Sequence, residues 1–253
     1  MPDLSVIIPT YNEEPNIRRT AEAVLDYLRQ GERSWELLLV DDGSRDRTPA
    51  IEQETARQEP RVRALVHATN RGKGYAVRRG MLAASGAVRL FLDADYSTPI
   101  EEAEKLLPRL EGECQVAIGT RRGAGARIET KPPLHRHLLG EAYIRLASRL
   151  LGSGVTDFNC GFKAFRAEAA ERLFRLQRHE GWSFDVEVLV LAERLGYRVE
   201  EVPVRWAHVQ ATSKVRPLAD GVRSFLALLR IWWDLRRGRY DLAEPHCPGA
   251  AAP

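Results

Sequence analysis

The stretch LFLDADYSTP, residues Leu90 to Pro99, joins an apolar run to two carboxylates that stand one residue apart. The run LFL is typical of the end of a buried strand. Because side chains alternate across a strand, Asp93 and Asp95 are expected to point the same way. Two like charges that close together are unfavourable unless a cation lies between them. A solvated turn also explains an isolated D-x-D pair, so the rest of the chain has to distinguish a turn from a cation site.

Strand and helix patterns alternate through the first half of the chain. Strands are expected at residues 4–9, 35–42, 62–68, 88–95 and 114–120, and helices at 14–30, 44–58, 72–84 and 99–110. This alternation predicts an α/β fold with a mostly parallel sheet and helices on both faces. Ligands of such sheets bind outside the carboxyl ends of the strands. The polar clusters PTYNE, DDGS, NRGKG and DAD each follow a strand, so they are expected to meet at one rim.

The second half of the chain is less regular. It contains an amphipathic helix at 134–152, a loop and strand at 157–165, a helix at 183–197 and a final strand at 198–206. No linker-like stretch separates the halves, so one domain is expected over residues 1–215. An amphipathic helix at 216–240 and a disordered tail at 241–253 are expected to follow it.

Composition excludes several classes of protein. The formal net charge of the 253 residues is +3, which gives no argument for nucleic-acid binding. Cys114, Cys160 and Cys247 are too few and too irregularly spaced for a disulfide framework or a zinc site, and they favour a reducing cytoplasm. The first residues show no signal-peptide pattern, and no apolar run is long enough to span a bilayer.

The glycine-rich stretch NRGKGYAVRRG is basic and opens a helix. Its backbone N–H groups and Lys73 could face a phosphate. It lacks the G-x-G-x-x-G order, so a dehydrogenase is not indicated. A phosphate site beside the D-x-D pair favours Mg²⁺ or Mn²⁺ on Asp93 and Asp95, because such cations also bind substrate phosphate oxygens.

The motifs VIIPTYNEE, DDGS, NRGKGYAVRRGM, LFLDAD, DFNCGFKAF, WSFDVE and TSK together resemble those of family 2 glycosyltransferases with the GT-A fold. Within that family the chain is most similar to the dolichyl-phosphate β-glucosyltransferase and dolichol-phosphate mannose synthase branch. The resemblance implies inverting transfer of a hexose from a nucleotide sugar, of the UDP-glucose or GDP-mannose type, to a polyprenyl phosphate. It covers about residues 4–215.

The resemblance also assigns roles to residues on the donor side. It implies nucleotide binding by Pro9, Tyr11, Glu13, Asp41 and Asp42. Lys73 of the glycine-rich stretch and Asp93 of the D-x-D pair are also expected to bind the nucleotide. It implies that Asp93 and Asp95 hold the metal, Mg²⁺ or Mn²⁺. Ser97 stands where the mannose synthases often carry a further polar ligand.

On the acceptor side the resemblance implies that Arg121 and Arg136 bind the acceptor phosphate, which suits the paired donors of arginine. It implies catalytic positions for Asp185, near the acceptor, and for Lys214, facing the diphosphate. A phosphate monoester is already largely dianionic at neutral pH and needs no base. A hydroxyl acceptor would need Asp185 as general base. A family 2 enzyme with a hydroxyl acceptor therefore stays open, as does a nucleotide-binding module without catalysis.

The segment LADGVRSFLALLRIWWDL, residues 218–235, has an apolar stripe at helical spacing. The stripe consists of Leu218, Val222, Phe225, Leu229 and Trp232, with Leu226 and Trp233 beside it. Residues 216–240 also contain six arginines against two aspartates. Tryptophan and arginine together suit a membrane interface with anionic headgroups. The pattern predicts peripheral binding to the cytoplasmic face of a membrane, and a helix packed on the domain is the alternative.

Overall fold

The centre of the structure is a seven-stranded sheet with the spatial order β3 (Val62–Val66), β2 (Trp35–Asp41), β1 (Leu4–Thr10), β4 (Val88–Leu92), β7 (Phe162–Arg166), β5 (Val116–Thr120) and β8 (Val199–Pro203). The computed structural model describes residues 1–130, 134–207 and 217–242, without the side chains of 130, 134–139 and 217–222. Every neighbouring pair of strands is parallel, except that β7 runs antiparallel to both β4 and β5. The expected α/β class with a mostly parallel sheet is therefore confirmed.

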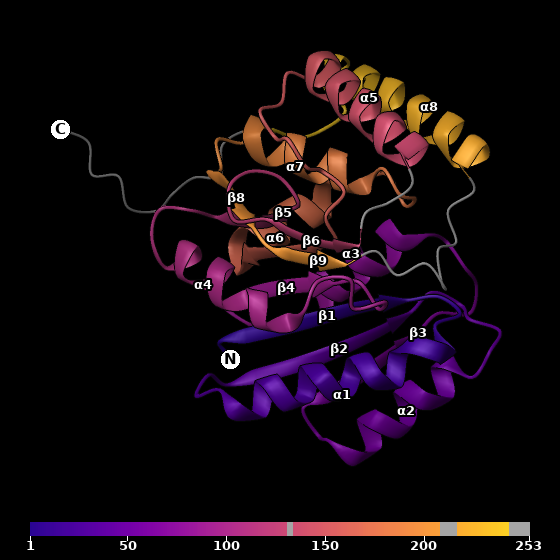
Figure 1. Cartoon of the computed structure of the whole chain (residues 1–253), viewed down its shortest axis with the longest axis vertical. Coiled ribbons are helices and arrows are strands. Elements are labelled where there is room, and N and C mark those ends of the chain that lie inside the picture. Colours follow the sequence, from indigo (N-terminus) through magenta and orange to yellow (C-terminus); the bar gives the residue numbers. More distant parts are fainter. Residues whose placement is uncertain (131–133, 208–216, 243–253) are drawn as a thin grey trace.

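Helices cover both faces of this sheet, as the alternation predicts (Figure 1). One face carries α1 (Glu14–Gln30), α2 (Thr48–Gln58) and α4 (Ala103–Glu111), the last preceded by the short 3₁₀ helix η1 (Ile100–Glu102). The other face carries α3 (Lys73–Ala83), α6 (Ala167–Leu176) and α7 (Phe184–Arg194). Beside α7, the helices α5 (Leu134–Leu151) and α8 (Pro217–Arg236) lie next to each other.

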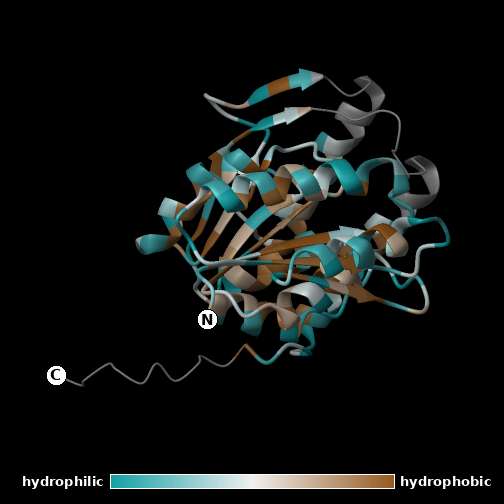
Figure 2. Cartoon of the chain, turned by 90° about the horizontal axis from the view of Figure 1, so that it is seen from below, coloured by the Kyte–Doolittle hydropathy of each residue, from teal (hydrophilic) through white to brown (hydrophobic). Residues whose placement is uncertain are grey.

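Strand β1 shows how the sequence builds this core. Its seven residues are all buried. Ile7 packs in the cluster that contains α3 and α6, whereas Val6 and Ile8 pack in the cluster that contains α1 and α4. Each such side chain contributes about 1.5–3 kcal/mol when it leaves water. In Figure 2 the strands are accordingly mostly brown and the outer surfaces of the helices mostly teal.

Several expected boundaries are wrong. The strand expected at 88–95 ends at Leu92, so the D-x-D pair lies in the turn that follows it. The final strand expected at 198–206 is divided at Val204, whose N–H donates to the carbonyl of Thr120 at 3.1 Å. The residues beyond it form β9 (Arg205–Ala207), which pairs in parallel with β6 (Arg127–Thr130) in a small second sheet. Neither β6 nor α6 is predicted by the sequence.

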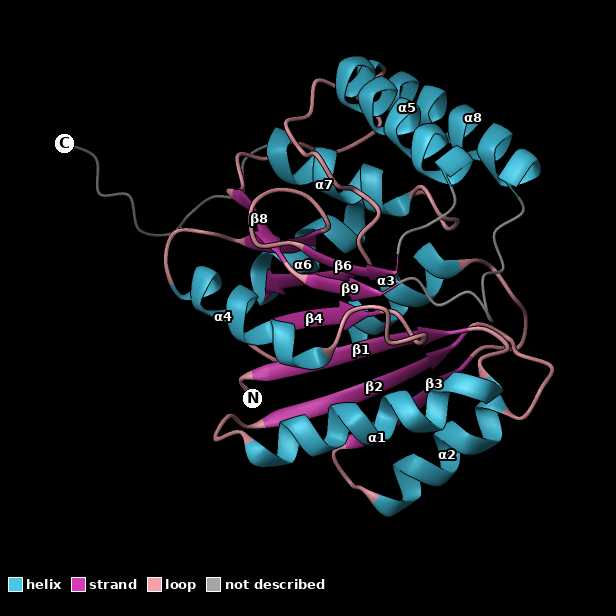
Figure 3. Cartoon of the chain, viewed as in Figure 1, coloured by secondary structure: helices cyan, strands magenta, loops and turns pink. Residues whose placement is uncertain are grey.

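The carboxyl ends of β1, β2, β3 and β4 meet at one edge, because these four strands are parallel neighbours (Figure 3). The four polar clusters follow these ends, so the expected rim exists. Of the expected tail, residues 243–253 lie outside the described part of the chain.

Candidate active site

The loops that follow β1 and β2 are locked together by hydrogen bonds. The N–H of Asn12, a residue with a positive φ of 51°, donates to the Ser44 hydroxyl at 2.7 Å. The N–H of Glu13 donates to the Thr48 hydroxyl at 2.8 Å. Pro9 is buried inside β1, while Tyr11 and Glu13 are partly exposed at the rim, where nucleotide binding is predicted.

Two buried aspartates lie at the end of β2: Asp41 is its last residue and Asp42 follows it. Asp41 accepts hydrogen bonds from the N–H groups of Gly43 and Ser44 through Oδ2, and its buried Oδ1 has no partner within the described part of the chain. Asp42 accepts the N–H groups of Arg71 at 3.1 Å and Gly72 at 2.6 Å. Burial raises the pKa of Asp42 despite these bonds. Asp42 therefore holds the glycine-rich loop against the end of β2.

Lys73 begins α3 and points into the rim. Its Nζ lies 2.6 Å from Oδ1 of Asp93, and its side chain is 13% exposed. Burial would lower the pKa of Lys73, but the charges of Asp93, Asp185 and Asp95 outweigh it and raise that pKa. The glycine before Lys73 has a φ of 118°, and a Cβ there would lie 2.5 Å from a backbone carbonyl oxygen, so only glycine fits.

The D-x-D carboxylates have separate partners. The carboxylate of Asp93 lies directly over the backbone of Gly161. The backbone N–H of Asp93 donates to the carbonyl oxygen of Gly161 at 3.1 Å. Asp95 accepts bonds from both the N–H and the hydroxyl of Ser97. Burial, and then the charge of Asp93, raise the pKa of Asp95. The charge of Asp93 therefore destabilises the charged form of Asp95, a cost that a bound cation would lower.

A metal at this position would take few ligands from the protein. Residues 1–130, 134–207 and 217–242 contain no group of three or more histidine, cysteine, aspartate or glutamate side chains arranged to hold a metal ion. Asp93 and Asp95 offer two carboxylates. Mg²⁺ in nucleotide sites is commonly held by one or two carboxylates together with substrate phosphates and water. The residues present fit that kind of site.

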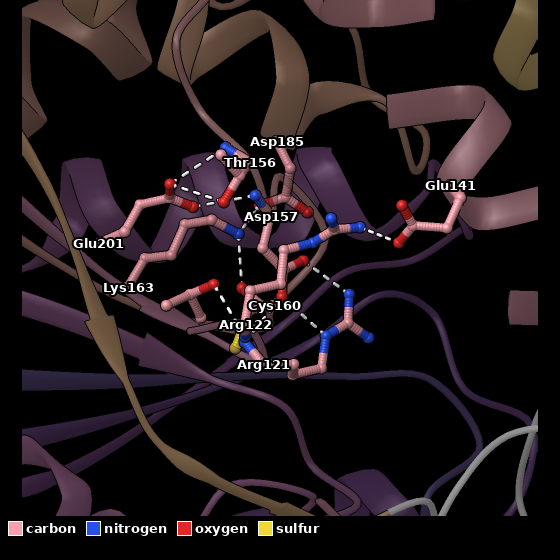
Figure 4. A network of polar contacts seen from close by, with 10 residues as sticks. Arg121, Arg122, Glu141, Thr156, Asp157, Cys160, Lys163, Asp185 and Glu201 are labelled. Carbon is pink, nitrogen blue, oxygen red and sulfur yellow. Dashed lines mark hydrogen bonds and ion pairs between the residues drawn. The ribbon is translucent and has the colours of Figure 1, made fainter. Parts of the chain in front are cut away.

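Arg121 directly follows β5 and lies in a polar network (Figure 4). Its guanidinium binds the buried Asp157 through two bonds of 2.9 and 2.6 Å. The N–H of Asp157 in turn donates to Glu201 at 2.9 Å. Burial opposes the charge of Arg121, but the bonds and charge of Asp157 raise its pKa, and the charge of Asp93 contributes. Arg121 is thus fixed within electrostatic reach of the D-x-D pair.

A second pair in this network involves Asp185, which the sequence singles out, and Lys163, which it does not (Figure 4). Lys163 is 1% exposed. Its Nζ lies 2.5 Å from Oδ1 of Asp185 and 2.6 Å from the carbonyl oxygen of Cys160. Burial raises the pKa of Asp185, although Lys163 and Lys73 act against it.

The structure brings most of the predicted residues together, and two of them lie partly or wholly outside the residues that it describes. Asp185 lies in the same electrostatic cluster as Lys73, Asp93 and Asp95. Arg136 belongs to α5, but its side chain lies outside the described residues, and so does the whole of Lys214. Lys163, Asp157 and Gly161 are missing from the sequence-based set. A lysine at an inward position of the strand FKAF was the signal that could have identified Lys163.

Comparisons with known proteins agree with this geometry. Residues 5–174 match the family model described as Glycosyl transferase family 2. A dolichyl-phosphate beta-glucosyltransferase of Drosophila melanogaster is 35% identical over 255 residues, covering 96% of this chain and 78% of the relative. The human dolichyl-phosphate beta-glucosyltransferase is 32% identical over 225 residues, covering 84% and 69%.

Solved structures share the fold at lower identity. Glucosyl-3-phosphoglycerate synthase from Mycobacterium tuberculosis, in complex with Mn²⁺, uridine diphosphate and phosphoglyceric acid, has a TM-score of 0.67 at 19% identity and covers 97% of this chain and 80% of its own. The mannosyltransferase PcManGT from Pyrobaculum calidifontis, in complex with GDP-Man and Mn²⁺, has a TM-score of 0.61 at 22% identity, covering 93% and 64%.

Proposed function

The chain belongs to glycosyl transferase family 2 and has a GT-A type fold, and from this premise we propose that it transfers a hexose from a nucleotide sugar to a polyprenyl phosphate with inversion. Membership in the family, with relatives named dolichyl-phosphate beta-glucosyltransferase, makes the chain a glycosyltransferase. Membership in this family argues against the two other classes, a dehydrogenase and a nucleotide-binding module without catalysis.

The donor half of the proposal rests on the rim formed by β1, β2, β3 and β4. Asp41 offers its unsatisfied buried Oδ1 to a donor group of the nucleotide. Lys73 lies where it can offset the charge of a diphosphate. A Mg²⁺ or Mn²⁺ ion on Asp93 and Asp95 would stabilise the negative charge of the departing nucleoside diphosphate. Solved relatives of the fold contain Mn²⁺ with UDP or GDP-Man, which favours this metal assignment.

The proposed acceptor rests on the network around Arg121. This network is the observation that favours a phosphate acceptor over a hydroxyl acceptor. The Nη1 group of Arg121 takes no part in the bonds to Asp157, so it can donate to an acceptor phosphate. An oxygen of the phosphate dianion attacks the anomeric carbon from the face opposite the diphosphate. The bond from that carbon to the diphosphate oxygen breaks, and no proton has to be removed from the nucleophile.

Asp185 supports the same choice. Its carboxylate is 4% exposed and paired with Lys163, so it is poorly placed to take a proton from a hydroxyl. In our proposal Asp185 orients Lys163 and offsets the charge of Lys73. A hydroxyl acceptor with Asp185 as general base is the second candidate, and no contact in the described part of the chain favours it.

Helix α8 supplies the route to a lipid substrate in this proposal. Its Leu228 and Ile231 are buried against the domain, whereas Phe225, Leu226, Leu229 and Trp233 are exposed. The guanidinium groups of Arg236, the last residue of α8, and of Arg237, which follows it, each lie 4.3 Å from the ring of a tryptophan on α8. No helix in the described part of the chain has the length and hydropathy of a membrane span. An exposed apolar stripe flanked by arginines suits a helix that lies in the plane of a membrane surface.

Nucleoside diphosphate release tests the proposal. Full-length protein with Mg²⁺ or Mn²⁺ is supplied with UDP-glucose or GDP-mannose, with and without a short polyprenyl phosphate. We expect release from one donor to depend on the polyprenyl phosphate. Equal release without the acceptor, or no release from any nucleotide sugar, would contradict the proposal.

A further inference from the structure

A cavity of about 710 Å³ lies between α3, the residues after α6, and the C-terminal part of α8. None of the rim residues Lys73, Asp93, Asp95 and Asp185 lines it, so it is separate from the proposed transfer site. Five of its lining residues are arginines: Arg78, Arg175, Arg178, Arg230 and Arg239.

The carboxylates that line this arginine cavity are all paired. Asp234 binds Arg239 at 2.9 Å. Glu180 binds Arg71, which lies outside the cavity, and Asp241 lies 3.7 Å from Arg172, also outside it. Each carboxylate of the cavity therefore already has an arginine partner, Arg239 from the cavity itself and Arg71 and Arg172 from outside it.

Three of the arginines have no carboxylate paired with their guanidinium groups. Within the described part of the chain, no carboxylate lies within 4.0 Å of the guanidinium nitrogens of Arg78, Arg178 and Arg230, although the backbone N–H of Arg178 donates to Glu187 at 2.9 Å. Arg78 donates to the carbonyl oxygen of Phe174 at 2.9 Å. Arg178 donates to a carbonyl oxygen at 3.5 Å. Burial, and then the charges of Arg230 and Arg178, lower the pKa of the neighbouring His179, while the charge of Asp234 acts against them.

We infer that this arginine cavity binds a phosphate-bearing group with at least two negative charges. Three guanidinium groups that have no ion-pair partner in the described part of the chain match the two or more charges of a phosphomonoester or a diphosphate better than the single charge of a carboxylate. Guanidinium also presents paired N–H donors that match phosphate oxygens. The volume is larger than one phosphate needs, so the rest of the ligand can lie inside the cavity.

The position of Arg230 gives this phosphate two possible sources. Arg230 follows Leu226 by one helical turn and precedes Trp233 by three residues, and both apolar side chains are exposed, by 57% and 46%. The cavity therefore adjoins the apolar stripe of α8, where a lipid headgroup would lie. A soluble phosphate compound would present the same chemistry.

Calorimetric titration with inorganic pyrophosphate, in EDTA to suppress metal-dependent binding at the rim, tests the soluble source. We expect saturable binding that Arg178→Gln with Arg230→Gln weakens at least about tenfold. Lys73→Met should retain this binding, because Lys73 belongs to the rim. Arg57→Gln with Arg109→Gln removes the same charge from the opposite face and should change little. Circular dichroism checks each fold, and Arg78→Gln replaces the pair if the double variant does not fold.

Cosedimentation with vesicles tests the lipid source. Vesicles that contain phosphatidic acid, whose phosphate is a monoester, are compared with phosphatidylserine vesicles matched in surface charge. We expect a preference for phosphatidic acid that Arg178→Gln with Arg230→Gln removes. Arg237→Gln, outside the cavity and directly after α8, should keep the preference.

Either arm alone can support the inference. It is overturned if pyrophosphate shows no saturable binding up to about 10 mM and vesicles show no preference. It is also overturned if the control pair at Arg57 and Arg109 weakens binding as much as the cavity pair, because the effect is then one of net charge. The inference does not depend on hexose transfer, so inactivity toward every sugar donor leaves both measurements valid.

Discussion

Gly161→Ala is the substitution whose effect follows most directly from the geometry. A Cβ at Gly161 would lie 2.6 Å from Oδ1 of Asp93 and closer still to the other atoms of that carboxylate. Non-bonded heavy atoms favour about 3.5 Å, so the carboxylate has to move by roughly 1 Å or more. That movement disturbs the 2.6 Å pair with Lys73. Displacements of about 1 Å in an active site cost on the order of 10²-fold in rate.

The assay combines turnover with thermal unfolding. We expect Gly161→Ala to lose about 10²-fold in nucleoside diphosphate release while its unfolding midpoint stays within about 4 °C of wild type, since a side chain rather than the backbone must move. Gly181→Ala is the matched control, because a Cβ at Gly181 meets nothing within 4 Å. Near-normal turnover in Gly161→Ala would refute the placement of Asp93 in the reaction.

Three further predictions address the metal, the core and the membrane. Asp95→Ala should lower turnover about 10³-fold in a folded protein, because the departing diphosphate loses its cation, and EDTA should do the same to wild type. Burial raises the pKa of Glu52 to about 8, although the Thr10 hydroxyl donates a hydrogen bond to its carboxylate. Between pH 4.5 and about 8 the folded protein therefore keeps a proton on Glu52 that the unfolded chain releases. Folding stability should therefore fall by about 1.4 kcal/mol per unit as pH rises from 4.5 to about 8, and Glu52→Gln should remove that fall in urea titrations. Leu226→Ser with Trp233→Ser should weaken binding to anionic vesicles, which should itself decrease at high salt.

Each of these has an outcome that counts against it. Turnover of Asp95→Ala at wild-type rate in EDTA would exclude the metal site. Equal pH dependence in Glu52→Gln and wild type would show that Glu52 is ionised in the folded protein. Val66→Ser, at an exposed apolar position on β3, is the control for the vesicle experiment, and an equal loss there would remove α8 as the binding surface.

The sheet and its rim could be predicted because the strands of the first half are rich in apolar residues and polar residues follow each of them. The direction of β7 could not, because an apolar run such as FKAF carries no information about which way it crosses a sheet. Strand β6 was missed since Arg127–Thr130 is polar and pairs only with β9, which lies about 75 residues further along the chain. The end of β4 was placed too late because Asp93, Ala94 and Asp95 continue the alternation of polar and apolar residues that is typical of a strand, although they lie in the turn after Leu92.

The candidate site, like the fold, could be predicted from the sequence only in part. Asp42 and Lys73 were predictable because they follow strand ends. The partners that fix Arg121 and Asp185 were not, since Asp157 and Lys163 approach them from segments far along the chain. For α8 the periodicity predicted an apolar stripe, and the structure turns Phe225 and Leu229 outward while Leu228 and Ile231 pack inward. Leu218 and Val222 of the predicted stripe lie outside the described side chains.

The choice between a phosphate and a hydroxyl acceptor tests the central claim most directly. Polyprenyl phosphate and the corresponding polyprenol are offered in equal amounts with the active donor, and products are identified by mass. We predict a hexosyl polyprenyl phosphate as the product. Asp185→Asn should lower the rate of its formation but should not remove a limb in the carboxylate range from the plot of rate against pH, because Asp185 does not act as a general base. Transfer to the polyprenol, abolished in Asp185→Asn and restored by azide, would contradict the account.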